Sequence, residues 1–163
     1  MRIITILISI LIFFNYNLSS QTKTVHGIVI SEDLESLPMV RISLDTAVIG
    51  ETDINGQFVI TIPQKADKLL FTWVGMERTT IQLLTDCDNL EVIMIYDAHY
   101  DFMTPRKIDR QREKRFEKLP ELHQLAFKKG LFKMENACFK QDFVPYKTQL
   151  DEIRNRMKNK PST

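Results

Sequence analysis

Hydrophobic and polar residues alternate with a period of two through most of residues 21–96, and this period is typical of half-buried β-strands. The alternation is strictest over residues 40–44, VRISL. Further short runs rich in β-branched and aromatic residues lie at 24–30, 58–62, 79–83 and 90–95. Because no helical period separates these runs, the pattern predicts about seven strands in an all-β sandwich, not alternating strands and helices.

One run within this region is more continuously apolar than the others. Residues 68–74, KLLFTWV, have almost no alternation, which predicts a strand buried on both faces. Trp73 is expected in the core with a partner for its indole N–H, and a ligand-stacking Trp is the alternative.

The stretch GETDINGQFVITIP, residues 50–63, contains a turn signal that resembles part of a calcium loop. A calcium loop places its Gly at the sixth position and closes with a Glu. Here Gly56 arrives two residues early after Asp53, and no Glu follows at the closing distance. Asn55-Gly56 instead favours the type I′ turn of a β-hairpin, so we expect a structural turn here.

After Tyr96 the period changes to that of amphipathic helices. Thr104 and Pro105 form a helix start, and the mixed charges of residues 106–119 predict a solvated surface helix. A second amphipathic segment begins at Leu122 and is interrupted near Gly130. The sequence therefore predicts an α-helical C-terminal extension.

A third helix is predicted from Pro145, with its apolar residues at spacings of four, three and four. Short isolated helices are marginal in water, so the helices of the extension need a surface to pack on. We expect them to dock on the sandwich, and a protein partner is the alternative surface. The candidate partner-facing residues are Tyr146, Leu150, Ile153 and Met157.

The first twenty residues have the features of a secretory signal peptide. Arg2 precedes a run of 12 apolar residues, and small residues precede Gln21. The run is shorter than the about 20 residues that cross a bilayer, although an uncleaved anchor is the alternative. The predicted organisation is a signal peptide at 1–20, a β-sandwich at 21–97 and a basic helical extension at 98–163, with no transmembrane span in the mature chain.

Charge is distributed unevenly between the two regions. Residues 21–96 carry five Lys or Arg against eleven Asp or Glu, whereas residues 97–163 carry sixteen against ten. The opposite net charges favour docking of the extension on the sandwich. The basic residues are interleaved with acidic ones and the chain is predicted to be exported, so we expect no nucleic-acid partner.

The predicted export bears on whether the cysteines form a disulfide. Cys87 and Cys138 are the two cysteines of the chain, and an oxidising compartment allows one disulfide between them. Two separately buried thiols are the alternative, because sequence gives no distance between them.

No constellation of catalytic residues is recognisable. The histidines His26, His99 and His123 do not stand at metal-ligand spacing from one another or from a cysteine, and no nucleophile elbow or phosphate-binding loop occurs. We therefore expect no catalytic residue, no cofactor and no metal ion.

The order of these features resembles the carboxypeptidase regulatory-like domain, a small transthyretin-like sandwich found in many secreted bacterial proteins, including those of Bacteroidota. The resemblance covers about 75 residues. Met39 and Met76 depart from it, since the family usually has Gly and an aromatic residue there. The residues that carry it are Val25-x-Gly27-x-Val29, Leu37-Pro38, Ile49-Gly50-x-Thr52-Asp53-x-Asn55-Gly56-x-Phe58, Phe71-x-Trp73-x-Gly75-Met76-Glu77 and Leu90-x-Val92.

The resemblance implies an immunoglobulin-like or prealbumin-like sandwich that works as a scaffold without catalysis. We expect an exported, periplasmic interaction protein, a subunit of a cell-envelope or outer-membrane assembly with protein partners there. A small peptide- or carbohydrate-binding module is the alternative, and an accessory domain of a protease system is the third possibility.

Overall fold

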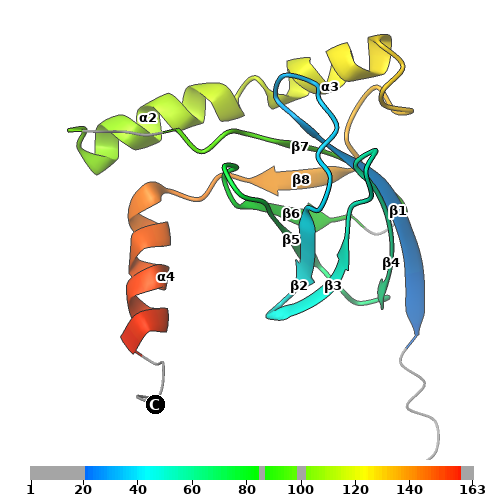
Figure 1. The fold of residues 1–163 in the computed structure, drawn as a ribbon, viewed down its shortest axis with the longest axis horizontal. Helices are drawn as coiled ribbons and strands as arrows, with labels where there is room; N and C mark the ends of the chain where they lie inside the picture. Colours follow the sequence, from blue (N-terminus) through cyan, green and yellow to red (C-terminus); the bar gives the residue numbers. More distant parts are fainter. Residues whose placement is uncertain (1–20, 85–86, 99–101, 159–163) are drawn as a thin grey trace, which may run out of the picture.

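The computed structural model describes residues 21–84, 87–98 and 102–158, and the predicted signal peptide lies outside this part of the chain. Eight strands form two β-sheets within it, and three helices lie in the C-terminal region (Figure 1). None of the helices in these described ranges has the length and apolar character needed to span a membrane.

The smaller sheet, sheet A, has three strands in the order β4-β1-β7. β1 runs antiparallel to β4 and parallel to β7. These strands are β1 (Thr22–Ser31), β4 (Gln57–Pro63) and β7 (Asn89–Met94).

The larger sheet, sheet B, has five antiparallel strands in the order β3-β2-β5-β6-β8. Its last strand comes from the region that the sequence predicted to be helical, so that prediction missed a strand. β8 is short and polar, and its extended form depends on pairing with β6. The strands are β2 (Arg41–Leu44), β3 (Ala47–Glu51), β5 (Lys68–Thr72), β6 (Thr79–Leu83) and β8 (Phe139–Asp142).

The main apolar core lies between the two sheets and follows from the alternation in the sequence. Along β4, Phe58, Ile60 and Ile62 are buried while the residues between them are exposed. The ring of Phe58 lies 5.8 Å from that of Phe71 on β5, so the sheets contact each other directly. Further members of this core are Val25, Val29, Ile42, Leu69, Ile81, Leu90, Val92 and Met94.

Two helices cover part of the outer face of sheet A. These helices are α2 (Pro105–Phe116) and α3 (Leu119–Lys128), which run across the top of the molecule in Figure 1. Their contact with the sheet is a second apolar cluster of Ile30, Ile93, Ile95, Leu119, Ala126 and Phe132. The extension therefore packs on the β-sheets through two of its helices.

β7 is buried on both of its faces from Leu90 to Met94, because Leu90, Val92 and Met94 lie in the core between the sheets and Ile93 lies against the helices. The sequence had predicted this for residues 68–74, and that prediction is wrong. β5 alternates instead, with Leu69 and Phe71 buried and Leu70 only half-buried.

The Asn55-Gly56 turn does not close a hairpin, as β3 and β4 belong to different sheets. Gly56 has a φ of 75° and Asn55 is not in the left-handed region, so the turn is not type I′. Asp53 Oδ1 accepts the backbone N–H groups of Asn55 and Gln57 at 2.9 and 2.8 Å. The turn thus leads the chain from one sheet to the other.

Candidate functional site

The last helix, α4 (Tyr146–Lys158), projects away from the layer formed by α2 and α3 (Figure 1). Of the four residues predicted to face a partner, Tyr146 is half-buried and the other three reach solvent. Leu150 is 36% exposed, Ile153 42% and Met157 73%. The structure therefore leaves most of this apolar seam uncovered.

The start of α4 is attached to α2 through Asp109 and Arg112. Asp109 Oδ1 accepts the backbone N–H of Tyr146 at 2.6 Å. Arg112 donates to the carbonyl oxygen of Val144 at 3.0 Å, and its guanidinium lies 5.1 Å from the centre of the Phe143 ring. α4 is therefore held at its first turn while its apolar seam remains free.

Arg112 also joins α2 to the loop between β5 and β6. It is 5% exposed and donates two hydrogen bonds to the carboxylate of Glu77, at 2.9 and 2.8 Å. A third contact joins it to Asp109 at 3.1 Å. Burial alone would lower the pKa of Arg112, but the hydrogen bonds and negative charges of Glu77 and Asp109 outweigh burial and raise it.

A second arginine of α2 binds the β-region in a similar way. Arg115 pairs with the carboxylate of Glu32 and donates to the carbonyl oxygen of Tyr96 at 3.0 Å. Glu32 in turn accepts the backbone N–H of Tyr96 at 3.0 Å. The predicted solvated helix therefore uses two of its basic residues to bind acidic side chains of the first region.

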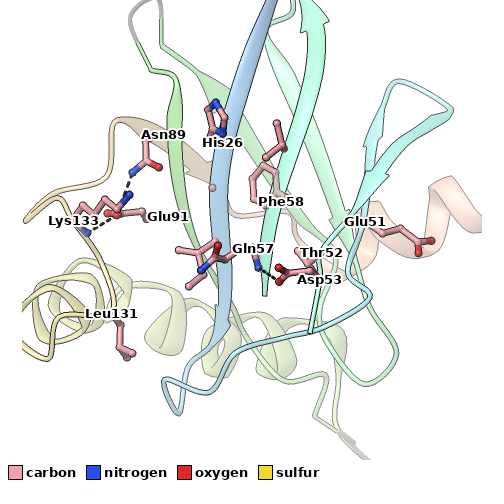
Figure 2. A pocket seen from close by; sticks show the side chains of 13 residues that line it. His26, Glu51, Thr52, Asp53, Gln57, Phe58, Asn89, Glu91, Leu131 and Lys133 are labelled. Atoms are coloured by element: carbon pink, nitrogen blue, oxygen red, sulfur yellow. Dashed lines mark hydrogen bonds between the residues drawn. The ribbon is translucent and has the colours of Figure 1, made fainter. Parts of the chain in front are cut away.

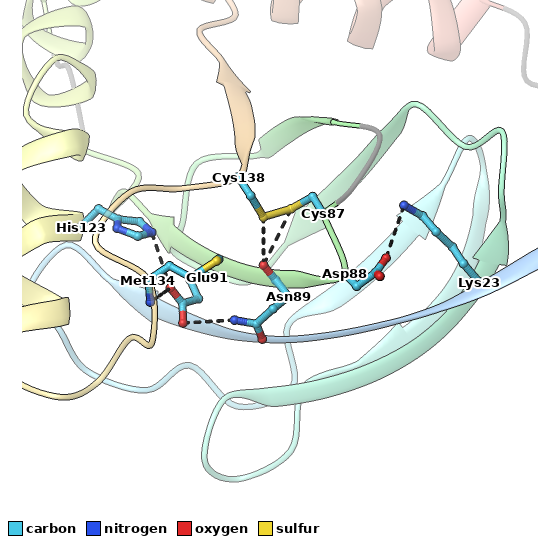
Figure 3. The surroundings of a disulfide bond; sticks show 8 residues. All are labelled: Lys23, Cys87, Asp88, Asn89, Glu91, His123, Met134 and Cys138. Carbon is cyan, nitrogen blue, oxygen red and sulfur yellow. Dashed lines mark hydrogen bonds and ion pairs between the residues drawn. A yellow bond between two sulfur atoms is a disulfide. The ribbon is translucent and has the colours of Figure 1, made fainter.

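The structure joins Cys87 and Cys138 in a disulfide, with their Cα atoms 5.6 Å apart (Figure 3). Cys87 precedes β7, and Cys138 precedes β8. The bond thus connects the edge strands of the two sheets at one end of the molecule. Its position fits a structural crosslink, because Cys87 is 1% exposed.

Glu91 lies near the disulfide on the helix-covered face of β7 and is 1% exposed. Its carboxylate accepts the backbone N–H groups of Lys133 and Met134 at 2.5 and 3.1 Å, and the side-chain amide of Asn89 at 3.2 Å. The segment of residues 131–138, which we call the strap, is therefore fastened to sheet A by a buried carboxylate and by Cys138 (Figure 3).

His123 of α3 approaches Glu91 from the helical layer (Figure 3). It is 5% exposed, and its ring lies 4.7 Å from that of Phe132. Its Nδ1 is 3.2 Å from the carbonyl oxygen of Glu135. Its Nε2 is buried without a hydrogen-bond partner and lies 3.8 Å from Glu91 Oε2.

The sequence prediction did not single out this pair as a site. Glu91 and His123 are 32 positions apart, and neither belongs to a known motif. The one available signal was a carboxylate in the apolar run LEVIMI, because a buried carboxylate needs compensating hydrogen bonds.

A different surface, on the exposed part of sheet A, surrounds a cavity of about 570 Å³ (Figure 2). Polar side chains from β1, β4 and the strap line it, among them His26, Gln57 and Lys133. Asp53 also lines the cavity, but its carboxylate already accepts a hydrogen bond from the backbone N–H of Gln57 (Figure 2). No residue predicted as a site from the sequence lies here.

No group of three or more His, Cys, Asp or Glu residues that could hold a metal ion occurs among residues 21–84, 87–98 and 102–158. His26 lines the exposed cavity of sheet A, whereas His123 is a buried residue of α3. His99 is outside the described residues. We therefore identify no set of ligands for a metal ion in the part of the chain that the structure describes.

The geometry defines a mostly β protein with two sheets of three and five strands, a helical layer on one sheet and a projecting C-terminal helix. No model of a known protein family and no curated protein matches this chain.

Proposed function

We propose that this protein is an exported, non-enzymatic interaction protein that holds α4 in place for a protein partner in the cell envelope. The observation that carries the proposal is the exposed seam of Leu150, Ile153 and Met157 on a helix whose first turn is anchored. An anchored helix with an uncovered apolar seam suits helix-in-groove or helix–helix recognition.

The shape and charge of α4 favour an acidic helical partner. The seam is narrow, with spacings of three and four residues, which fits a helix packed alongside better than a lipid surface. Residues 146–158 carry four basic and two acidic side chains. A second copy would bring equal net charges together, whereas an acidic partner would complement them.

The crosslink between Cys87 and Cys138 supports export, because disulfides persist in oxidising compartments. The predicted signal peptide is consistent with the same destination. We place the protein in the periplasm, as a separate subunit of an outer-membrane or other envelope assembly, because the resemblance to carboxypeptidase regulatory-like domains implies this setting.

Contacts between motif residues support that resemblance and an immunoglobulin-like sandwich. A side chain at Gly27 would collide with the Phe58 ring, at 2.4 Å from its Cβ. Thr52 Oγ1 donates to the carbonyl oxygen of Leu37 at 2.6 Å and accepts the N–H of Val40 at 2.9 Å. Gly27 therefore has to remain small beside Phe58, and Thr52 links its own segment to the backbone of the Leu37 segment.

Site-specific photocrosslinking in intact cells tests the proposal. A photoreactive phenylalanine analogue at position 153 should crosslink to an envelope protein through an acidic amphipathic helix. The same analogue at position 54 is the control, because Ile54 is 84% exposed but lies at the turn between the sheets. Ile153→Glu should reduce binding of the identified helix, as a synthetic peptide, at least tenfold, and Ile54→Glu should leave it unchanged.

Three results would contradict the proposal. The first is the absence of any crosslinked partner when the photoreactive analogue is at position 153. The second is equal loss of peptide binding in the Ile153→Glu and Ile54→Glu variants. The third is a stable homodimer that Ile153→Glu dissociates, since a second copy would then occupy the seam.

A further inference from the structure

A cavity of about 440 Å³ lies where sheet A, the junction of α2 and α3, and β8 meet. We call it the junction cavity. This volume is within the range of about 300–1,000 Å³ that small-molecule sites occupy. Its apolar lining includes Ile93, Phe116, Leu119 and Phe139, and its polar lining includes Glu91 and His123.

The topology explains why this space stays open. β7 and β8 are the outermost strands of their sheets and do not pair with each other. The helical layer spans the gap between them at the α2–α3 junction. The exposed residues Glu117 and Lys140 also line the cavity, so it opens to solvent on their side while Ile93 and Leu119 form its buried wall.

His123 gives the cavity a defined polar end. A backbone carbonyl is only an acceptor, so Nδ1, which faces the carbonyl of Glu135, carries a proton. Nε2 has no hydrogen-bond partner, and the 3.8 Å to Glu91 Oε2 is too long for a hydrogen bond. A buried polar atom in this state gains from any group that completes its bonding.

Glu91 determines which kind of group fits. Its Oε1 accepts two donors, from Lys133 and Asn89, whereas its Oε2 accepts one, from Met134, and retains acceptor capacity toward His123. An amino group has a separate N–H donor for each of Oε2 and Nε2 and would satisfy both atoms, whereas a hydroxyl has one hydrogen and can satisfy only one of them. A carboxylate in that place would instead face the carboxylate of Glu91.

We propose that the junction cavity binds a small apolar molecule whose one polar end is an amino group. The donor contacts Glu91 and His123, and the apolar body packs against Ile93, Leu119 and Phe139. This is a binding function separate from the α4 seam, because neither Leu150 nor Ile153 lines the cavity.

Four naphthalene derivatives with one apolar body test the proposal on the purified full-length mature protein. They are 1-naphthylmethanol, 1-naphthylmethylamine, 1-methylnaphthalene and 1-naphthoate. NMR titration should shift the His123 imidazole nitrogens and the Ile93 and Leu119 methyl groups. The amine should bind at least tenfold more tightly than methylnaphthalene, the alcohol should bind less tightly than the amine, and naphthoate should bind most weakly. Equal or tighter binding of the alcohol would contradict the requirement for two N–H donors.

Two variants separate the head group from the body. His123→Phe keeps an aromatic ring against Phe132 and should reduce the preference for the amine, since Glu91 Oε2 alone then accepts from it, while methylnaphthalene binding remains. Ala137→Phe places a ring at an exposed lining position and should weaken all four probes. Equal binding of the four probes, or no shift at His123 and Leu119 up to the solubility limit, would overturn the proposal from the wild-type protein alone.

Discussion

Arg112 and Glu77 form an ion pair with two hydrogen bonds, of 2.9 and 2.8 Å, although 35 residues separate them in the chain. The pair connects α2 to the loop between β5 and β6, and Arg112 also bonds the segment that precedes α4. The sequence showed that the two regions carry opposite net charges, and this ion pair is one contact through which those charges attract.

Replacing Arg112 by Met should lower the free energy of unfolding by about 3 kcal/mol, because the carboxylate of Glu77, whose side chain is 13% exposed, would lose its partner. Chemical denaturation measures the change. Arg110→Met is the matched control, since Arg110 is exposed on the same helix, and should change stability by less than about 0.5 kcal/mol. Equal effects of the two substitutions would show that the pair contributes nothing.

The stabilisation by Arg112 should not depend on pH in the alkaline range. Its pKa is raised in the folded protein, so its contribution is complete below the unfolded-state pKa and is lost only as pH rises through the still higher folded-state value. The stability difference between the wild type and Arg112→Met should therefore stay constant between about pH 7 and 10. A steady decrease over this range would contradict the assignment.

Removing the disulfide with Cys87→Ser and Cys138→Ser should cost about 4 kcal/mol, because the bond spans 51 residues and restricts the unfolded chain. Denaturation midpoints of the double variant and of the reduced wild type should agree. Two titratable thiols in the native, unreduced protein would refute the crosslink.

The hydroxyl of Thr52 should contribute to the junction between the sheets. Thr52→Val keeps the shape but leaves the N–H of Val40 and the carbonyl of Leu37 without their buried partner, at a cost of about 1–3 kcal/mol. Thr61→Val on the exposed side of β4 is the control and should be nearly neutral. A neutral Thr52→Val would mean that solvent reaches these groups.

Two isoleucines in different positions should respond differently to truncation. Ile30 is fully buried between sheet A and the helices, so Ile30→Ala should cost about 2–5 kcal/mol. Ile153→Ala should change the stability of the isolated protein by less than about 0.5 kcal/mol, because α4 leaves that side chain exposed. A large loss in Ile153→Ala would show that α4 packs on this protein itself.

Local sequence patterns predicted individual strands and helices better than they predicted which strands pair with each other. The alternation along β4 identified its buried residues, and Pro105 marked the start of α2 correctly. The Asn55-Gly56 turn was located correctly, but the hairpin was not, since β3 pairs with β2 and β4 with β1. A turn signal depends on the conformations of a few residues, whereas pairing depends on every strand that competes for the same edge.

The burial of β7 and the existence of β8 show the same limit. The apolar run at 68–74 looked more buried than β7, yet the helical layer covers β7 and leaves Leu70 half-exposed. The four residues of β8 have no strand pattern of their own, and they are extended because they pair with β6. The pairing of Glu91 with His123 likewise arises only when α3 lies on sheet A.

The sequence by itself determined most of the extended and helical segments apart from β8, the inward-facing residues of strands such as β4, and the opposite charges of the two regions. These properties depend on each residue and its near neighbours. The tertiary structure decided which strands share a sheet, which face the helices cover, that Cys87 meets Cys138, and that α4 keeps its seam exposed. Such outcomes depend on contacts between residues far apart in the chain, where the gain from burial and hydrogen bonding must exceed the entropy lost in bringing them together.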